Sequence, residues 1–467
     1  MKMWLGRFRQ PLDPEFESWQ RSFPFDQRLL THELAASRVH AHALKNAGVL
    51  SPAELDAILA GLDQIGEQAY VSPTFLKDAD AEDVHHFVEK HLVMLIRDTG
   101  YKLHSGRSRN EQIATDLRLY IRDSIDQLRS EITELGNALV SRAEQAGSAA
   151  MPTYTHQQRA EPVLVAHWLL AYVEMLLRDL GRLADCRKRL NLCPLGSGAV
   201  AGATLPLDRR AMAAKLEFEA PTANSIDATT DRDFVLEFVN ALVLLGLHLS
   251  RWAEEMVLFS TQEFGFVAPP EKYSTGSSAM PQKKNPDLLE LTRAKVARTI
   301  GDFTTLVTVL KGLPLAYNKD LQETQEPLFD ATEGLLSLLP LVTGWMKAAE
   351  FNYPRMQHAA QSGFLNAWAA ATYLVGHGVP FRLAHERVGN AVQHCLAKGC
   401  ELQDLALEEL RQFSPEFEKD VYSRLSLESV LSIHDVEGGT APAQVAHAIA
   451  EAKQKLTSVL EEAHAHA

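Results

Sequence analysis

The most regular feature of the sequence is the spacing of its apolar residues. Seven of them recur at steps of three or four positions between Leu117 and Leu139, which predicts a long helix with one continuous apolar seam. Pro340 is expected to interrupt the last of the long helices, since proline lacks a backbone donor. Strand-like alternation is nearly absent, so the pattern predicts an all-α fold. The other long helices are predicted at residues 163–190, 234–259, 288–310 and 331–346.

These helices are too apolar to be covered by one chain. The run from Val163 to Val173 is apolar almost all round, and such a helix must be buried on every side. We therefore expect packing against further copies of the chain, which predicts a homo-oligomer. The 467 residues exceed one ordinary hydrophobic core. Changes in pattern predict an N-terminal helical domain at residues 1–112, a central long-helix domain at 113–362 and a C-terminal helical domain at 363–467.

Composition narrows the possible classes of function. The net charge of -14 argues against a general nucleic-acid-binding protein, which would normally be basic. The four cysteines form no CxxC pair or metal-binding spacing, which indicates reduced packing residues in a cytoplasmic protein without a metal. The first residues lack the apolar stretch of a secretory signal, and no uncharged apolar run is long enough to span a membrane. Neither nucleic acid nor a membrane is therefore an expected partner.

Residues 270–287 stand out between two of the predicted helices. From residue 273 they read YSTGSSAMPQKKNPD, which combines hydroxyls, two adjacent lysines, a glycine and two prolines. The prolines forbid a continuous helix and Gly276 relaxes the backbone, so this stretch predicts a loop. Its charges and hydroxyls suit a mobile lid that closes over an anionic substrate, while composition alone fits a polar connector equally well.

Residues 276–287, GSSAMPQKKNPD, resemble the signature loop of the fumarase/aspartase superfamily, whose members release fumarate or a similar product by β-elimination. The QKKNPD part is similar to the version of the argininosuccinate lyase family, and similar segments cover essentially the whole chain. The resemblance implies a three-domain all-α fold with a five-helix bundle. It also implies a homotetramer with a twenty-helix core and sites shared between subunits, a small-molecule substrate, and no cofactor or metal.

Residues 153–162, TYTHQQRAEP, lie between two predicted long helices. A histidine in a loop is most often structural, but it titrates near neutrality and so can serve as an acid or a base. The segment resembles the family's YTHxQxAQP, which implies catalytic roles for Thr155 and His156. Glu290 fits the first turn of a helix through the helix dipole alone. By resemblance it also pairs with His156, between subunits, and raises the basicity of that histidine.

Residues 105–110, SGRSRN, place two guanidinium groups ahead of a predicted helix. Arginine forks match carboxylates, so this segment suits a dicarboxylate site, although a solvated basic turn has the same composition. It resembles the family's LHTGRSRNDQ, and residues 82–85 and 317–322 resemble its EDVH and YNKDLQ. The resemblance implies that the substrate-binding residues are Ser22, Asp83, His85, Ser108, Arg109, Asn110, Arg232, Ser278, Asn285, Tyr317, Gln322 and Gln325.

Some positions depart from the family pattern. Gln325 stands where a lysine is expected to hold a substrate carboxylate, so the charge-assisted part of that hydrogen bond is lost. Glu111 replaces an aspartate and adds one methylene to the acid. These changes bear on substrate affinity rather than on the type of reaction.

The resemblance implies reversible β-elimination of argininosuccinate to arginine and fumarate, the last step of arginine biosynthesis. It gives Ser277 the role of the base that removes a proton next to a succinyl carboxylate. A hydroxyl is a weak base, so Lys283, the loop backbone and water exclusion have to lower its pKa. Lys283 and Asn285 then stabilise the developing negative charge, and His156 protonates the leaving nitrogen.

Three alternatives stay open at this point. One is another superfamily lyase, such as adenylosuccinate lyase, against which residues 154–157 and 282–284 argue. A second is a non-catalytic structural homologue of the kind recruited as lens crystallin, which is disfavoured by the joint presence of Ser277, His156, Lys283 and Glu290. The third is a diverged lyase that acts on a related succinyl adduct, and Gln325 keeps it open.

Overall fold

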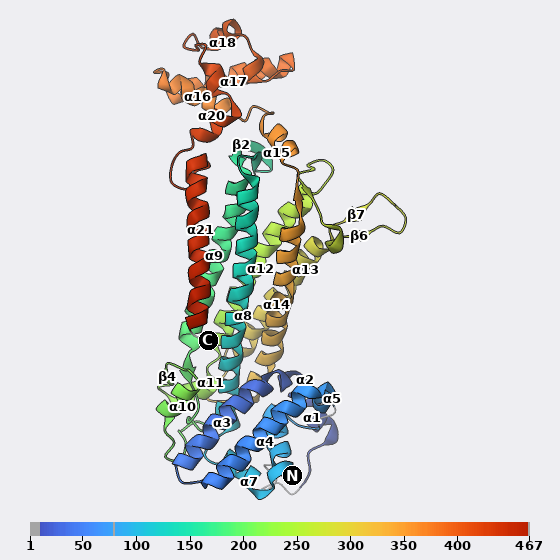
Figure 1. Cartoon of the computed structure of the whole chain (residues 1–467), viewed down its shortest axis with the longest axis vertical. Coiled ribbons are helices and arrows are strands. Elements are labelled where there is room, and N and C mark those ends of the chain that lie inside the picture. The colour runs from blue at the N-terminus through green and yellow to red at the C-terminus, as the bar shows by residue number, and fades with distance from the viewer. Residues whose placement is uncertain (1–9, 78–79, 466–467) are drawn as a thin grey trace. The chain divides into compact units, whose positions relative to one another are not determined.

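Helices dominate the structure, a computed structural model that describes residues 10–77 and 80–465 (Figure 1). Five helices of 24 to 38 residues lie where the sequence predicts long helices, and they confirm the predicted all-α fold with a long-helix bundle. Residues 1–9, the start of the predicted N-terminal domain, lie outside the described residues. These five helices are α8 (Arg109–Ala146), α9 (Val165–Leu190), α12 (Asp233–Phe259), α13 (Asp287–Leu310) and α14 (Gln325–Ala348).

The apolar seam expected between Leu117 and Leu139 is the buried side of α8. All seven of its residues are buried, because steps of three and four keep them on one face of the helix. The helix predicted from residue 163 begins only at Val165, since residues 163 and 164 belong to a strand.

The interruption predicted at Pro340 is wrong. Helix α14 runs without a break from Gln325 to Ala348 and contains Pro340. Proline removes the hydrogen bond to the carbonyl four residues earlier. Because Pro340 is exposed, water can take the place of the missing donor, and the helix continues.

Shorter helices form the two ends of the chain and the connection between α9 and α12. Residues of α16 to α19 and of their connections share a hydrophobic core that includes Leu374, Val388 and Phe417. The shorter helices are α1 (Pro14–Trp19), α2 (Phe23–Asp26), α3 (Leu30–Asn46), α4 (Pro52–Val71), α5 (Pro73–Lys77), α6 (Val84–Ile96), α7 (Asp98–Tyr101), α10 (Arg209–Lys215), α11 (Ser225–Thr230), α15 (Tyr353–Ala360), α16 (Ala367–Gly376), α17 (Phe381–Lys398), α18 (Leu407–Phe413), α19 (Val421–Arg424) and α20 (Leu427–Ser432). The last helix, α21 (Pro442–Ala465), is as long as α13 and α14.

The described residues contain four pairs of short strands. Only the pair of β3 and β4 is parallel, and the others are antiparallel. The pairs are β1 (Ala150–Thr155) with β2 (Gln158–Leu164), β3 (Leu192–Cys193) with β4 (Ala220–Pro221), β5 (Val267–Ala268) with β8 (Glu350–Phe351), and β6 (Thr275–Gly276) with β7 (Lys284–Asn285). The 3₁₀ helices are η1 (Gln27–Leu29), η2 (Lys102–His104), η3 (Glu271–Tyr273), η4 (Lys319–Thr324) and η5 (Leu402–Asp404).

Contacts within the chain group it into two compact units. The first unit consists of residues 1–128, 181–244 and 297–335, and the second of residues 129–180, 245–296 and 336–467. Each unit therefore contains part of each of the helices α8, α9, α12, α13 and α14. The division into three domains stays a prediction.

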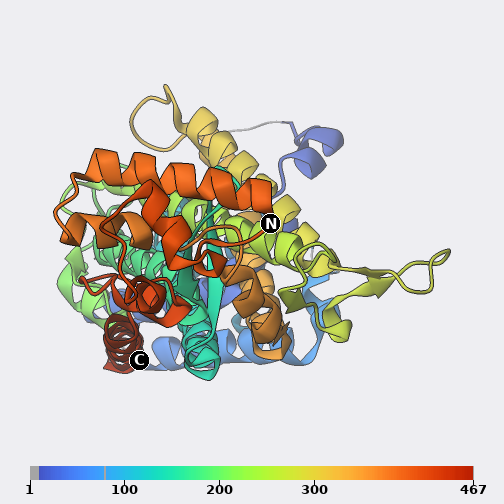
Figure 2. The ribbon, with the colours of Figure 1, turned by 90° about the horizontal axis from the view of Figure 1, so that it is seen from above.

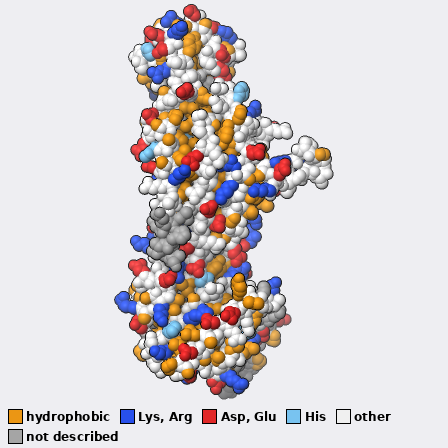
Figure 3. Space-filling view, viewed as in Figure 1, with side chains coloured by type: hydrophobic (Ala, Val, Ile, Leu, Met, Phe, Trp, Pro, Cys, Tyr) orange, Lys and Arg blue, Asp and Glu red, His pale blue; other side chains and the backbone are white. Residues whose placement is uncertain are grey.

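Helix α12 is long and apolar enough to cross a membrane by length and composition alone. Half of its most apolar stretch is buried within the chain, while Leu247 and Leu258 remain exposed. Apolar side chains also reach the surface between charged ones in the space-filling view (Figure 3). A core helix has the same composition, so a single helix of this kind is weak evidence for a membrane span.

All four cysteines are free, and Cys186, Cys193 and Cys395 are buried.

Candidate active site

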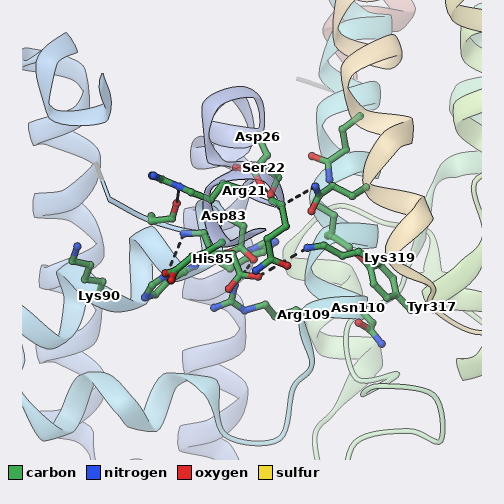
Figure 4. Close-up of a pocket in the computed structure, with 18 of the residues that line it drawn as sticks. Arg21, Ser22, Asp26, Asp83, His85, Lys90, Arg109, Asn110, Tyr317 and Lys319 are labelled. Carbon is green, nitrogen blue, oxygen red and sulfur yellow. Dashed lines mark hydrogen bonds and ion pairs between the residues drawn. The ribbon is translucent and has the colours of Figure 1, made fainter. Parts of the chain in front are cut away.

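A cavity of about 370 Å³ in the first unit gathers eight of the predicted substrate-binding residues (Figure 4). A volume of this size fits a small molecule. Gln322 and Gln20 lie 302 positions apart, yet Gln322 Nε2 donates to the Gln20 carbonyl at 3.1 Å. Only the fold can bring such distant segments together. The eight residues are Ser22, Asp83, His85, Arg109, Asn110, Tyr317, Gln322 and Gln325.

Several of these side chains lie at the N-terminal ends of helices α6 and α8. Asp83 caps α6, and its carboxylate accepts a hydrogen bond from the His86 N–H at 2.7 Å. Arg109 begins α8 and forms an ion pair with Asp83. Burial opposes the charge on Asp83, but the Arg109 guanidinium and neighbouring groups still lower its pKa. The cavity wall therefore carries a charged carboxylate–guanidinium pair at neutral pH.

Asp26 lies in the same wall and was not among the predicted site residues. Its carboxylate accepts hydrogen bonds from Ser22 Oγ at 2.6 Å and from the Val84 N–H at 3.0 Å. Burial, followed by the charge of Asp83, raises the pKa of Asp26 to about 7 despite these bonds. Asp26 therefore gains or loses a charge inside the cavity near neutral pH. The signal in the sequence is its position one helical turn after Ser22.

His85 connects the cavity to a buried cluster of charged groups. Its Nδ1 lies 3.0 Å from Glu33 Oε2 and 3.7 Å from Asp116 Oδ2. Burial opposes the charge on Glu33, but Arg107 and His85 outweigh it and lower the Glu33 pKa. Burial and the neighbouring Glu33 raise the pKa of Asp116 well above its usual range. The cluster therefore holds one charged and one protonated carboxyl.

Glu33, His85 and Asp116 also bring potential metal-ligand atoms within 4.8 Å of one another. The Arg107 guanidinium lies 3.5 Å from Glu33, and Gln112 Nε2 donates to both Glu33 oxygens. A buried guanidinium already serves as the counter-ion there and would repel a divalent cation. The charge of the Glu33 carboxylate is therefore already balanced by Arg107, and the cluster does not suit a metal.

Ser108 and Arg232, two further predicted residues, lie next to the lining of the cavity. Ser108 Oγ accepts the Asn110 N–H at 3.3 Å. The buried Glu111 carboxylate accepts the N–H groups of Ser108 and Gly198, both at 3.0 Å. Burial lowers the pKa of Arg232 to about 10, while the neighbouring Tyr317 opposes that shift. Direct substrate contacts by Ser108 and Arg232 stay predictions.

Gln325 is the lining residue that departs from the family pattern. The residue is only 4% exposed, and its Oε1 makes no hydrogen bond within the described part of the chain. The amide leaves this position without the charge of a lysine. Lys319, from the same segment, lines the cavity, and its Nζ lies 4.0 Å from Glu82.

Thr155 and His156 lie at the tip of the β1–β2 hairpin in the second unit. His156 and Gln157 form its two-residue turn, with φ values of 52° and 58°. Both Thr155 and His156 are exposed. Neither lines the cavity of the first unit.

The predicted loop forms a ribbon around β6 and β7, which extends away from the neighbouring ends of α12 and α13 (Figures 1 and 2). The Asp287 carboxylate fastens its base by accepting the Thr275 N–H at 3.0 Å and the Thr275 hydroxyl at 2.7 Å. At the tip, Ser277 Oγ accepts the Ala279 N–H at 3.3 Å and the Met280 N–H at 3.1 Å. The ribbon therefore presents its hydroxyls and lysines at the surface.

The remaining catalytic candidates are not brought together within one chain. Lys283, Ser278 and Glu290 are exposed, and Asn285 is half-buried. His156 and Glu290 make no hydrogen bond with each other in the described residues, so their pairing between subunits stays a prediction. The cavity also has charged lining residues that were not named as site residues from the sequence, although Glu82 and Lys319 lie in the motifs at 82–85 and 317–322: Glu17, Arg21, Asp26, Asp80, Glu82, Lys90 and Lys319.

Two family models match the sequence. One, described as "Lyase", covers residues 6–301. The other, described as "Argininosuccinate lyase C-terminal", covers residues 364–432. The argininosuccinate lyase of Acidobacterium capsulatum is 59% identical over 465 residues, which cover 98% of this chain and 96% of that protein. That of Koribacter versatilis is 57% identical over 464 residues, with 99% of each chain covered.

Solved structures show the same fold. EDDS lyase in complex with formate superposes with a TM-score of 0.86 at 26% identity, covering 98% of this chain and 93% of that one. Class II fumarase from Schistosoma mansoni superposes with a TM-score of 0.73 at 17% identity, covering 85% and 89%. The second likeness concerns the fold alone.

Proposed function

Because the chain belongs to the argininosuccinate lyase family, it cleaves argininosuccinate to arginine and fumarate, and we propose that it does so by β-elimination at a site completed by other copies of the chain. The observation that carries this function is the identity to named argininosuccinate lyases along essentially the whole chain. A cytoplasmic location is part of the proposal and agrees with four free cysteines.

We propose that the two ends of the substrate meet different parts of the protein. The cavity is lined by five carboxylic side chains and four lysine or arginine side chains, which suits the cationic arginine end. The ribbon carries Lys283 and Lys284 beside Ser277 and Ser278, which suits the dicarboxylate that leaves as fumarate.

In the proposed reaction Ser277 removes a proton from the carbon next to a succinyl carboxylate. The electrons of that bond form the new double bond as the carbon–nitrogen bond breaks. Lys283 and Asn285 stabilise the negative charge that develops on the carboxylate. His156 gives a proton to the leaving guanidino nitrogen, which balances the proton that Ser277 takes from the carbon. Glu290 orients His156, and the Thr155 hydroxyl next to His156 helps to hold the substrate.

The site needs more than one chain, and we propose a homotetramer. Several large apolar side chains of the long helices are exposed in the single chain, although such helices are expected to be covered. Association of α12, α13 and α14 with their copies would bury them. These residues are Leu247, Leu258, Leu291, Ile300, Val307 and Leu341.

Incubating the purified protein with argininosuccinate, and with adenylosuccinate in a parallel cell, tests the function directly. Fumarate is followed by its ultraviolet absorbance. We expect fumarate from argininosuccinate alone. Fumarate from adenylosuccinate alone, or from neither compound with a folded oligomer, would contradict the proposal.

Asp26 gives the site a dependence on pH. Inhibition by the product arginine is expected to strengthen about fivefold as the pH rises through 7, because ionised Asp26 attracts the cationic ligand. The variant Asp26→Asn should lack this dependence, which inhibition constants from fumarate release will measure. Asp80→Asn, at an exposed acid of the same cavity, should keep it and serves as the control.

Rising pH is expected to strengthen arginine binding but to lower the stability of the fold. The folded-state pKa of Asp26 is raised, so folding favours its protonated form. Its contribution to the free energy of unfolding is therefore present at acid pH and lost as the pH rises to about 7. An Asp26→Asn protein whose inhibition by arginine kept the parent's pH dependence would refute the assignment.

A further inference from the structure

The hairpin that carries His156 is exposed and held in place by its surroundings. Its turn consists of two non-glycine residues in the left-handed region, His156 and Gln157. A two-stranded hairpin is marginally stable on its own, so such a turn needs external support. On one side Tyr154 supplies it, since its ring lies 5.6 Å from Phe264 and 6.2 Å from Phe259.

Arg159 supports the opposite strand. It pairs with Tyr154 across the ladder, next to the last pair before the turn. Its Nη1 donates to the Ala359 carbonyl at 3.2 Å and to Ser362, at 3.2 Å for the carbonyl and 3.3 Å for the hydroxyl. These acceptors lie at the C-terminal end of α15, where the helix dipole also favours a cation. One guanidinium thus fastens the strand to the end of a helix.

Two other contacts fasten the same strand further along. The Glu161 carboxylate lies 3.3 Å from His434 Nε2. The Leu164 N–H donates to Thr440 Oγ1 at 2.9 Å. Residues 359–362 precede the segment 364–432, and residues 434 and 440 follow it. Strand β2 is therefore bonded to both connections of a helical segment that has its own hydrophobic core.

We infer that Arg159 is a positioning residue that fixes His156 by tying its hairpin to the connections of the segment 364–432. The inference rests on the proposed function, in which His156 protonates the leaving nitrogen. Proton transfer requires the donor within hydrogen-bond reach of its target, and a displacement of about 1 Å can cost about a hundredfold in rate. Arg159 lies three residues from His156 and makes three hydrogen bonds outside the hairpin, so it is the residue best placed to set that distance.

The test compares Arg159→Met with Arg142→Met in the full-length protein. Arg142 also donates to carbonyls at the end of a helix, those of Met346 and Lys347 in α14, but its bonds do not reach the hairpin. We expect Arg159→Met to lower kcat about tenfold to a hundredfold with KM within about twofold. Arg142→Met should leave both constants near those of the parent while losing comparable thermal stability.

Chemical rescue separates positioning from loss of stability. Adding guanidinium chloride at low millimolar concentration to Arg159→Ala should restore part of kcat, and Arg159→Lys should retain part of it. The same salt should not change Arg142→Ala. Parent-like kcat in Arg159→Met, or equal losses in the two methionine variants, would overturn the inference while parent activity upholds the proposed function. A parent protein that releases no fumarate would refute the proposed function itself, and the inference with it.

Discussion

A Ser277→Ala variant is expected to cleave argininosuccinate about 10³-fold more slowly than the parent protein, with an almost unchanged free energy of unfolding. The rate falls because no other group on the ribbon replaces the hydroxyl in removing the carbon-bound proton. Stability is kept because the hydroxyl only accepts two local N–H groups, those of Ala279 and Met280, on an exposed ribbon. Initial rates of fumarate formation and urea denaturation curves measure the two effects.

The matched control is Ser274→Ala. Ser274 lies three residues earlier, and its hydroxyl donates to the Pro270 carbonyl at 2.9 Å. This variant should retain most of the parent rate. Should Ser277→Ala keep more than about a tenth of the parent kcat, the base of the reaction must be another group.

Mixing two inactive variants is expected to restore activity. His156→Asn changes one exposed side chain and Ser277→Ala removes one half-buried hydroxyl on the ribbon, so both proteins should fold and assemble. If a site takes His156 from one copy and Ser277 from another, random mixing leaves about a quarter of the sites with both native groups. Partial unfolding, mixing at equal concentration and refolding should then yield up to about a quarter of the parent rate.

The readout needs proof that mixed oligomers formed. Native mass spectrometry of one variant carrying a mass tag will count them, and each variant refolded alone gives the background rate. Mixed oligomers without any gain in rate would mean that His156 and Ser277 of one site come from the same chain. That result would refute the shared site but leave the reaction itself untouched.

The long helices could be predicted from the sequence because their signal is local and repeated. The seam from Leu117 to Leu139 repeats over six turns, and tertiary packing only confirms it. Pro340 shows the limit of such a local signal. Proline predicts an interrupted helix because it lacks a backbone donor, but the sequence does not show whether water can replace that donor. The β1–β2 hairpin was missed because its strands carry Pro152 and Pro162, which weaken any strand pattern.

In the candidate site, too, residues in local motifs could be predicted and residues joined only by the fold could not. Segments such as residues 105–110 and 276–287 carry recognisable chemistry in adjacent positions, so their residues were found. The cluster of Glu33, His85 and Asp116 draws on positions up to 83 residues apart, and no local pattern joins them. Asp26 needed the fold as well, because the two largest causes that raise its pKa are burial and the charge of Asp83, which is distant in the sequence.

Helix α12 has a consequence for the life of a newly made chain. A folded chain without partners presents a helix that a membrane would accept by composition, with Leu247 and Leu258 exposed. Surfaces of this kind are where chains adhere to lipid, to chaperones or to one another. The rate at which subunits find each other therefore sets how long each one is at risk, and expression at a low level should lengthen that interval.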